Sequence, residues 1–382
     1  MSAWQGKYII GLTGNIATGK SVVRKMLEHL GAYGIDADAL SHRAIAQGAP
    51  GYQAVVDAFG KWILAKDGQI DRDKLGKIVF NDPEALAQLE SIVHPLVRQA
   101  VEHLVKQASK KVVVIEAIKL LESPLRDHCD GVWVATASPE TQLARLKKKR
   151  GMDEETARER MLAQPRQADK EKAADVIIKN NGSFDATWKQ VQTAWEKLFP
   201  AAKPEPLRKA TTVTTTATPE ELSIVRAGPQ QAEEIASFIT KVSGGQRSLS
   251  RADVMAAFGE KAFLLLKARG GIAGLVGWQV ENLVARTDEV YLVSGLPVAD
   301  AMRFLITEVE EASKELQSEA SLVFISPELA KAAAVWSGLG YEVRTPDSLT
   351  VNAWREAAQE SYVADTVMLF KQLRVDRVLR PI

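Results

Sequence analysis

The stretch Gly14–Ser21 (GNIATGKS) constrains the fold of this chain more than any other. It follows a hydrophobic run, Tyr8–Leu12, and a helical pattern begins at Val22. Two glycines let successive backbone N–H groups turn inward, and the following helix contributes its positive N-terminal end. Lys20 can reach the β- and γ-phosphates and Ser21 can ligate Mg²⁺, which packing alone would not require. The stretch therefore predicts a phosphate-binding loop between a strand and a helix. The predicted nucleotide-binding residues here are Gly14, Asn15, Ile16, Ala17, Thr18, Gly19, Lys20, Ser21 and Val22.

Length and composition narrow the class of protein. With 382 residues, the chain exceeds one ordinary hydrophobic core, so we expect at least two domains. A formal net charge of +1 disfavours a broad basic surface, and hence nucleic acid as the main partner. The single cysteine, Cys129, excludes an internal disulfide, fits a reducing compartment and is interpreted as a small buried hydrophobe. We find neither a signal-peptide pattern nor a membrane-spanning apolar run, and therefore predict a cytoplasmic protein without a membrane partner.

Acidic residues follow two further hydrophobic segments. Asp36 and Asp38 come after Ala32–Ile35, and Glu116 ends the apolar run Lys111–Glu116. Ligands of open α/β sheets collect at the carboxyl ends of strands, so these acids can face the phosphates. Asp36 suits a helix N-cap, whereas Asp38 is either a second cap or a catalytic acid, and we favour catalysis. Glu116 is either an acid directed at Mg²⁺ or an ordinary residue at a strand end.

The rest of the first half alternates predicted helices and strands. Residues 39–108 have a mostly helical pattern that His94-Pro95 interrupts. A buried strand is predicted at 131–136, and the last strand with its turn at 174–182. A helix from Phe184 to Phe199 closes the unit. Between Arg145 and Lys172 the pattern is helical and densely charged, which is typical of a solvated helical hairpin or of a cationic lid.

Several motifs in the first half occur together and in a fixed order. Residues 7–199 resemble the dephospho-CoA kinase family, and the match is far more specific than the phosphate-binding loop alone. The motifs that carry the resemblance are Leu12–Ser21, Ile35–Asp38, Gly68–Arg72, Val79-Phe80, His94–Leu96, Leu120–Glu122, Ser138–Arg145, Arg160 with Gln164, Ala174–Ile177 and Asn180–Gly182.

The resemblance implies a phosphotransferase that uses ATP and Mg²⁺ to phosphorylate the ribose 3′-hydroxyl of dephospho-CoA, the last step of coenzyme A synthesis. The implied catalytic residues are Asp38, Lys20 and Arg145, with Arg145 also on the ATP phosphates. Asn181 and Gly182 are expected near the adenine, and Ser21 and Glu116 are expected at the metal. Asp38, Arg72, His94 and Lys119 are expected to bind dephospho-CoA. Three positions depart from the family pattern: Asn15, Lys119, and Lys149 with its neighbour Arg150. The sequence leaves open which cation of the lid closes on ATP: Lys149, Arg150 or another.

The second half begins after the segment 200–221, which is rich in Pro, Thr and Ala and is typical of a linker. Strands are predicted at 223–226, 262–268, 272–281, 289–293, 321–325, 341–344 and 366–372, with helices at 230–242, 299–316 and 327–339. This order, and Ala334–Tyr341 in particular, resembles the GNAT acetyltransferase fold. The loop that would hold the acetyl-CoA pyrophosphate contains Pro297 and Asp300, which remove a donor and add negative charge. Trp336 occupies the position at which that family often has a tyrosine that acts as the general acid. We therefore expect a degenerate module for regulation, binding or assembly.

Together these observations predict an α/β fold in two domains. Residues 1–199 form a P-loop kinase with a parallel sheet, a helical acceptor region and a lid; residues 200–221 form a linker; and residues 222–382 form an α+β GNAT-like domain. Three alternatives stay open: a kinase of the same class with another acceptor, a bifunctional kinase and N-acetyltransferase, and a non-catalytic sensor that binds ATP. The sequence leaves the oligomeric state open.

Overall fold

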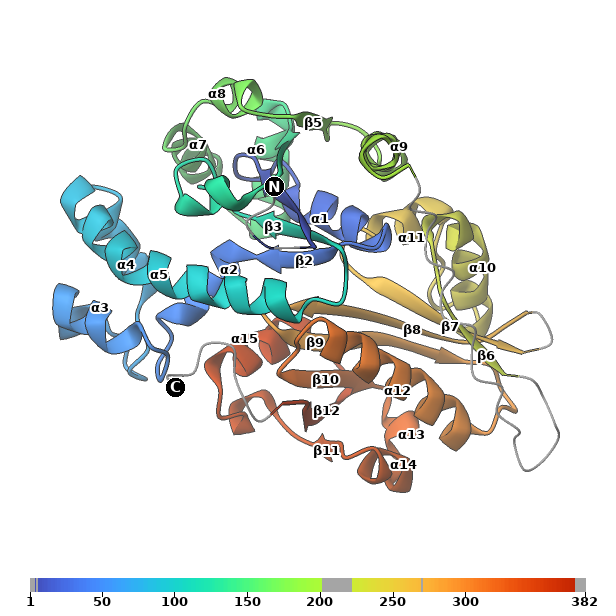
Figure 1. The fold of residues 1–382 in the computed structure, drawn as a ribbon. Helices are drawn as coiled ribbons and strands as arrows, with labels where there is room; N and C mark the ends of the chain where they lie inside the picture. Colours follow the sequence, from blue (N-terminus) through green and yellow to red (C-terminus); the bar gives the residue numbers. More distant parts are fainter. Residues whose placement is uncertain (1–3, 5, 201–221, 269–270, 375–382) are drawn as a thin grey trace.

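The computed structural model describes residue 4 and residues 6–200, 222–268 and 271–374, and these form two β-sheets (Figure 1). The sheet of the N-terminal half is parallel throughout, in the order β2-β3-β1-β4-β5. Its strands are β1 (Tyr8–Thr13), β2 (Tyr33–Asp36), β3 (Val112–Glu116), β4 (Gly131–Thr136) and β5 (Val176–Lys179). The parallel sheet that the apolar runs predicted is thus confirmed, and the phosphate-binding loop leaves its central strand.

Helices cover both faces of this sheet, which explains why β1, β3 and β4 are apolar on both sides. One face packs against α1 (Lys20–His29) and α9 (Phe184–Leu198). The other face packs against the helical region that the sequence predicted. That region contains α2 (Ala37–Ala44), α3 (Tyr52–Phe59), η1 (Lys61–Ile63), α4 (Arg72–Val79) and α5 (Pro83–Gln107). A short 3₁₀ helix, η2 (Pro124–His128), links β3 to β4.

The charged stretch folds into helices, as its pattern predicted. It contains α6 (Pro139–Arg150), α7 (Glu154–Leu162) and α8 (Gln167–Lys172). In Figure 1 these helices lie above β2 and β3. We refer to α7, α8 and the connection between them as the lid.

Helix α5 corrects one expectation. The sequence predicted an interruption at His94-Pro95, whereas the helix runs unbroken from Pro83 to Gln107 with Pro95 inside it. Proline removes one intrahelical hydrogen bond at a cost of about 3 kcal/mol. The helix buries a long apolar stripe that includes Val97, Val101 and Leu104, and this packing offsets the loss.

The sheet of the second half is mixed, in the order β11-β12-β10-β9-β8-β7-β6, with β9 and β10 parallel and the other neighbours antiparallel. Its strands are β6 (Ser223–Arg226), β7 (Ala262–Ala268), β8 (Gly271–Glu281), β9 (Val284–Leu292), β10 (Ala320–Ile325), β11 (Glu342–Val343) and β12 (Val367–Gln372). The helices are α10 (Ala232–Val242), α11 (Arg251–Ala257), α12 (Val298–Glu315), α13 (Pro327–Ala330), α14 (Ala333–Gly338) and α15 (Asn352–Ser361), with 3₁₀ turns η3 (Pro229–Gln231) and η4 (Pro346–Ser348).

Several details of the second half differ from the sequence prediction. Strand β9 begins at Val284 rather than at Glu289, and the predicted helix 327–339 is two short helices, α13 and α14. Helices α11 and α15 were not predicted. Ser250 and Asp253 form a capping box at the start of α11, a signal that the sequence does contain. The predicted linker lies outside the described residues, apart from Pro200.

The two halves are in direct contact through the turn between β8 and β9. Asn282 and Leu283 both have positive φ, 51° and 60°, which fits a tight hairpin turn. Leu283 is buried in the hydrophobic core of the N-terminal half. Arg43 of α2 donates to the carbonyl of Asn282 and pairs with the buried Glu319.

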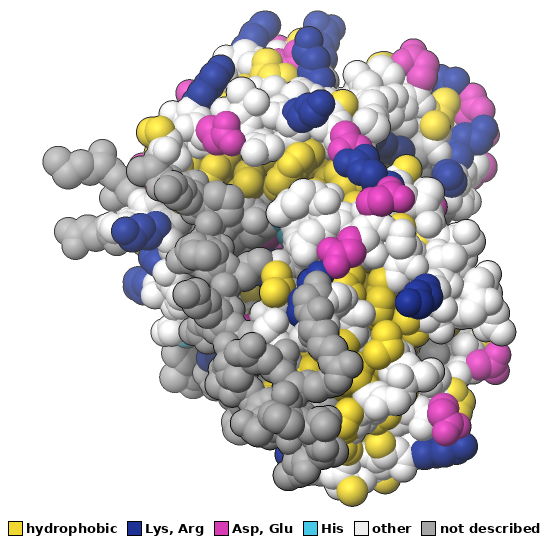
Figure 2. Space-filling view, turned by 90° about the vertical axis from the view of Figure 1, so that its right-hand side faces the viewer, with side chains coloured by type: hydrophobic (Ala, Val, Ile, Leu, Met, Phe, Trp, Pro, Cys, Tyr) yellow, Lys and Arg dark blue, Asp and Glu magenta, His cyan; other side chains and the backbone are white. Residues whose placement is uncertain are grey.

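Two further observations concern the charge of the surface and the possibility of a membrane-spanning helix. On the face that Figure 2 displays, basic and acidic side chains are interspersed. Among the described residues, no helix combines the length and apolar character needed to cross a bilayer.

Candidate active site

The phosphate-binding loop depends on its two glycines for steric reasons. Gly14 has a φ of 149°, and a Cβ there would lie 2.3 Å from the carbonyl oxygen of Ala135. Gly19 has a φ of 88°, and its Cβ would lie 2.0 Å from Nδ2 of Asn180. Both positions need left-handed backbone and have no room for a side chain. The loop geometry that the sequence predicted therefore requires glycine at both ends.

The lid lies directly on this loop. The backbone N–H of Ile16 donates to Oε1 of Gln164 at 2.7 Å, and that of Asn15 donates to Oε1 of Gln167 at 3.2 Å. The side chain of Asn15 also donates to the carbonyl of Pro165 at 2.9 Å. Amide oxygens thus occupy loop donors of the kind that phosphate oxygens use. Gln164 and Gln167 were not among the predicted site residues.

Arg145 and Asn180 join the loop to the rest of the sheet. The Arg145 guanidinium donates to the carbonyls of Ala17 at 3.1 Å and Asn180 at 2.8 Å, and burial lowers its pKa. Asn180 donates through Nδ2 to the carbonyl of Thr18 at 2.9 Å. The structure therefore places Arg145 against the loop, and its role on the ATP phosphates stays a prediction. Asn180 is a further residue that contacts the loop, and the sequence analysis did not select it.

Ser21 and Glu116 face each other at the ends of different elements. Lys20 and Ser21 open α1, and Glu116 ends β3. The Ser21 hydroxyl donates to Oε1 of Glu116 at 2.8 Å, and the Lys20 ammonium lies 3.5 Å from the carbonyl oxygen of Asn15. The structure thus brings together the two residues that the sequence predicted as metal ligands.

Asp38 lies in the first turn of α2, near these groups. Its two carboxylate oxygens accept from the backbone N–H of Ile118 at 3.3 and 3.0 Å. Burial, with a further contribution from Asp36, raises the pKa of Asp38 to about 6, although Lys20 and the Ile118 N–H act in the opposite direction. Asp36 caps α2 by accepting from the N–H of Ala39 at 2.9 Å, as predicted. The cap is therefore made by Asp36, and the Asp38 carboxylate is directed to Ile118.

Lys170 is a site residue that the sequence analysis did not single out. It belongs to α8, yet only 2% of it is exposed, and its ammonium donates to the carbonyl of Ile118 at 2.6 Å. Thr13 donates to the same carbonyl at 3.0 Å. The Ile118 peptide is thus held by Asp38 on one side and by Lys170 and Thr13 on the other. In the sequence Lys170 was one of many basic residues in the charged stretch, and no local signal distinguished it.

The predicted acceptor-binding residues lie on or next to the helical region. Arg72, at the start of α4, pairs with Glu356 of α15 at 2.6 Å, and Lys119 pairs with Glu90 at 2.7 Å. His94 is half-buried in the middle of α5. Their roles in binding dephospho-CoA stay predictions.

Other predicted residues are placed as follows. Asn181 accepts from the N–H of Ser138 at 2.6 Å, next to Gly182 at the end of β5. Lys149 and Arg150 end α6, but their side chains lie outside the described part of the structure. Burial raises the pKa of Cys129 to about 12, which keeps the thiol protonated and is consistent with a packing role.

The residues present fit Mg²⁺ bound together with a nucleotide. Within the described ranges no three His, Cys, Asp or Glu residues gather into a metal-binding group. Magnesium is usually held by one or two protein oxygens together with substrate phosphates, so it does not need such a cluster. The Ser21 hydroxyl and Oε1 of Glu116 supply two hard oxygen ligands at the loop.

The second half retains the features that led us to expect a degenerate acetyl-CoA loop. Helix α12 begins directly after Pro297, which is its N-cap, and Asp300 lies in its first turn. Trp336 is buried, and its indole N–H donates to the carbonyl of Leu329 at 3.0 Å. Trp336 therefore has a structural partner, and neither a tyrosine hydroxyl nor a glycine pair stands at these positions.

Comparisons with known proteins place the first half of the chain in a family. A family model described as dephospho-CoA kinase matches residues 8–186. A curated dephospho-CoA kinase from Streptomyces avermitilis is 45% identical over 190 residues, which are 50% of this chain and 93% of that protein. A solved dephospho-CoA kinase from Campylobacter jejuni is 27% identical, with a TM-score of 0.34, over 50% of this chain and 98% of its own. A solved GNAT-family acetyltransferase from Staphylococcus aureus is 14% identical, with a TM-score of 0.33, over 40% of this chain and 99% of its own. Since the S. avermitilis kinase is matched over nearly its whole length, this chain belongs to the dephospho-CoA kinase family.

Proposed function

We propose that residues 1–199 transfer the γ-phosphoryl group of ATP to the ribose 3′-hydroxyl of dephospho-CoA, giving coenzyme A and ADP. The observation that carries this proposal is the convergence of three strand ends. Lys20 and Ser21 follow β1, Asp38 follows β2, and Glu116 ends β3. Phosphoryl transfer requires positioning and charge stabilisation more than covalent catalysis, and these are the groups that supply both.

In the proposed reaction Asp38 orients the 3′-hydroxyl and accepts its proton. The hydroxyl oxygen then forms a bond to the γ-phosphorus, the bond from that phosphorus to the β–γ bridging oxygen breaks, and ADP leaves with the electron pair. A carboxylate with a pKa of about 6 is suited to this task, because it is ionised at neutral pH and still basic.

The remaining groups bind and neutralise the phosphates. Loop N–H groups and Lys20 hold the β- and γ-phosphates, and Arg145 adds positive charge beside the loop. Ser21 and Glu116 would hold Mg²⁺, which would neutralise charge on the phosphate oxygens. Phosphate oxygens replace the Gln164 and Gln167 side chains on the N–H groups of Ile16 and Asn15. Arg72, His94 and Lys119 bind dephospho-CoA.

The test is ADP release by the full-length chain with ATP, Mg²⁺ and dephospho-CoA, run beside pantetheine, adenosine and no acceptor. We expect turnover with dephospho-CoA alone and a product that carries a 3′-phosphate. Turnover with adenosine instead would assign the chain to another acceptor. Tight ATP binding with no turnover on any acceptor would favour the sensor alternative.

For residues 222–382 we propose a regulatory, binding or assembly role without acetyl transfer. Pro297 and Asp300 at the start of α12 support this, because they disfavour a pyrophosphate there. One observation favours the bifunctional alternative: Glu289 on β9 is buried, and its Oε2 has no hydrogen-bond partner in the structure. Release of thiol from acetyl-CoA with a panel of amines decides between the two, and we expect none above background.

The domain boundaries and the location in the cell are also proposals. We place the division in the segment 200–221 and the protein in the cytoplasm, which its single cysteine supports. Limited proteolysis within 200–221 and fractionation of cells test these two statements.

A further inference from the structure

Arg24 lies inside the N-terminal half and contacts carboxylates from three elements. Its Nε donates to Oε2 of Glu116 at 2.7 Å, its Nη1 donates to Oε1 of Glu28 at 2.7 Å, and its Nη2 lies 3.9 Å from Oδ2 of Asp36. Only 6% of the Arg24 side chain is exposed. Burial opposes its charge, but Glu28 and Glu116 outweigh burial and raise the pKa of Arg24. Arg24 therefore stays charged and joins α1, β2 and β3 at one point.

Two of these three carboxylates connect Arg24 to residues of the proposed kinase site. Glu116 uses its other oxygen to accept from Ser21 at 2.8 Å, at the proposed metal position. Asp36 caps α2, whose first turn holds Asp38. Arg24 thus lies between the metal-binding residues and the proposed base. Its guanidinium contacts one residue from each of these two parts of the site.

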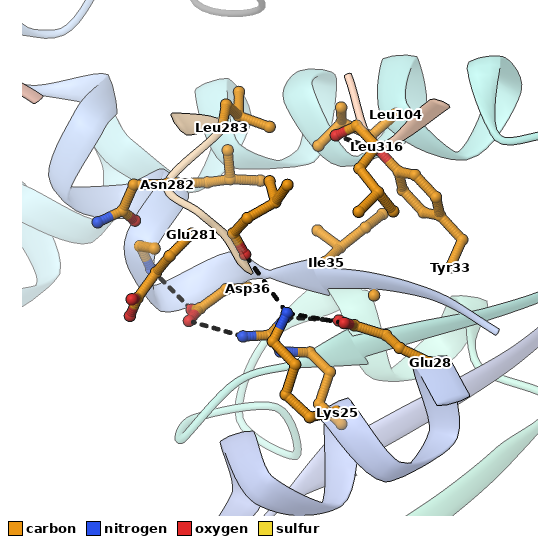
Figure 3. A pocket seen from close by; sticks show the side chains of 15 residues that line it. Lys25, Glu28, Tyr33, Ile35, Asp36, Leu104, Glu281, Asn282, Leu283 and Leu316 are labelled. Carbon is orange, nitrogen blue, oxygen red and sulfur yellow. Dashed lines mark hydrogen bonds and ion pairs between the residues drawn. The ribbon is translucent and has the colours of Figure 1, made fainter. Parts of the chain in front are cut away.

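The third carboxylate, that of Glu28, connects Arg24 through Lys25 to the second half of the chain. Glu28 accepts from the Lys25 ammonium at 2.8 Å, and the same ammonium lies 3.4 Å from the carbonyl oxygen of Val280, at the end of β8 (Figure 3). Burial disfavours the Glu28 carboxylate, but Lys25 and Arg24 outweigh it and hold its pKa at about 2. An unbroken series of polar contacts therefore runs from the Ser21 hydroxyl through Glu116, Arg24, Glu28 and Lys25 to the Val280 carbonyl at the β8–β9 hairpin.

The second half also covers the edge of the kinase sheet at this place. Strand β2 is an edge strand, and the hairpin turn and the end of α12 lie over it, around a small pocket that opens to solvent (Figure 3). Tyr33 on β2 donates to the carbonyl of Leu316 at 3.4 Å, and Leu283 reaches the kinase core. The Arg24 side chain itself is only 6% exposed, so its contacts with the carboxylates are stronger than they would be in water.

We propose that Arg24 is a positioning residue of the kinase site and that the β8–β9 hairpin of the second half is a structural part of that site. Arg24 holds the Glu116 carboxylate toward Ser21 and fixes β2 under α2, while the hairpin holds Lys25 and Glu28 around Arg24. The proposal rests on the kinase function proposed above. It gives the second half a role in phosphoryl transfer that needs no ligand of its own.

Gly34 offers a variant that disturbs the cluster without touching the predicted site. A Cβ on Gly34 would lie 2.0 Å from Oε1 of Glu28 and 3.1 Å from Cγ of Arg24. The obstacle is the end of a flexible side chain, so Gly34→Ala displaces the Glu28 carboxylate rather than the backbone. Arg24→Lys keeps the charge but loses the fork that binds Glu116 and Glu28 together. Leu283→Ala weakens the hairpin contact.

Each variant is assayed as the full-length chain for kcat, for KM of ATP and for the Mg²⁺ concentration that gives half-maximal rate. For Arg24→Lys and Gly34→Ala we expect kcat to fall about ten- to a hundredfold and the Mg²⁺ requirement to rise, with KM for ATP nearly unchanged, because the groups displaced lie behind the metal ligands. Leu283→Ala should show a smaller change in the same direction. In a Glu116→Gln background, Arg24→Lys should cost little more, because the two residues act together.

Two matched controls separate this role from a general loss of stability. Gly338→Ala introduces the same methyl group where nothing lies within 4 Å. Arg251→Ala breaks a contact between the two halves, with Asp185 of α9, that does not lead to Arg24. We expect wild-type kcat and Mg²⁺ dependence for both controls, and thermal unfolding is recorded for every variant. Wild-type values for folded Arg24→Lys and Gly34→Ala would overturn the inference alone. Absence of turnover in the unmodified chain would overturn the proposed function and this inference with it.

Discussion

At the residue scale, Asp38 combines two properties that a general base near neutral pH requires. It is within hydrogen-bond distance of a fixed backbone donor, the N–H of Ile118, and its surroundings disfavour the charged form. Burial is the largest cause of the raised pKa, and Asp36 adds to it. The carboxylate is therefore held in place and is more basic than an exposed aspartate.

For Asp38→Asn we predict a loss of turnover of about a hundredfold or more, with binding of ATP retained. In the unmodified enzyme kcat/KM should rise with pH through about 6, because Asp38 must lose its proton to act, and this rise should be absent in the variant.

The same group affects the stability of the fold. The folded state holds the Asp38 proton more tightly than the unfolded chain does, so the contribution of Asp38 to stability is lost as pH rises through about 6. Asp38→Asn should therefore not destabilise the protein at pH 8. A wild-type rate would remove Asp38 from the catalytic role.

Lys170 leads to a second prediction at this scale. Lys170→Met removes the cation that holds the Ile118 carbonyl, and so loosens the peptide on which Asp38 rests. We expect kcat to fall about tenfold, as for other groups that support a catalytic residue. Lys172→Met is the control, since its side chain on the same helix is 79% exposed. Equal rates for both variants would mean that the buried lysine serves stability alone.

At the scale of elements, α5 shows how packing outweighs a local signal. Pro95 breaks the backbone hydrogen-bond pattern, and the sequence alone suggested an interruption there, yet the helix continues for three more turns to Gln107. Its apolar residues face the core that α2, α3 and α4 share. Tertiary burial thus decided the length of this element.

The same helix provides a stability prediction. Pro95 is exposed, and Pro95→Ala restores an N–H that can donate to the carbonyl of Ser91. We expect the free energy of unfolding to rise by about 1–3 kcal/mol, measured by urea denaturation. Gln99→Ala, also exposed on this helix, should change it by less than about 0.5 kcal/mol. A destabilised Pro95→Ala protein would show that the helix is fitted around the proline.

At the scale of the whole molecule, the two halves are joined by a buried charged contact as well as by apolar packing. Arg43 of α2 pairs with Glu319, whose side chain is fully buried before β10. Phe258, next to α11, accepts from His29 at 2.8 Å if that ring nitrogen carries its proton. Burial is the main cause that lowers the pKa of His29 to about 4, so the ring is neutral at physiological pH. The halves should therefore unfold together.

Arg43→Met tests this coupling. Removing one partner of a buried ion pair costs about 3–5 kcal/mol, so we expect a clearly lower midpoint of thermal unfolding, still in one transition. Arg251→Met breaks the exposed pair with Asp185 and should shift the midpoint much less. Two separate transitions in the unmodified chain, only one of them moved by Arg43→Met, would mean that the halves are thermodynamically independent.

The sequence by itself determined the parts of this protein that depend on local chemistry. Glycines with positive φ, a lysine and a serine at a helix start, apolar runs and N-cap residues act over a few positions, so the loop, the strands of the parallel sheet and most helices could be predicted. Asp38 and Glu116 could be predicted to lie near the phosphate-binding loop because parallel strands align their carboxyl ends.

Only the tertiary structure decided which charged residues act together. Arg24 meets Glu116 across 92 positions, Lys170 meets Ile118 across 52, and Lys25 meets Val280 across 255. In sequence these basic residues look like any others on amphipathic helices, because nothing local records what lies opposite them. The contact of the second half with the edge strand of the kinase sheet was hidden for the same reason. It depends on how two folded surfaces fit, which no period or motif of either half encodes.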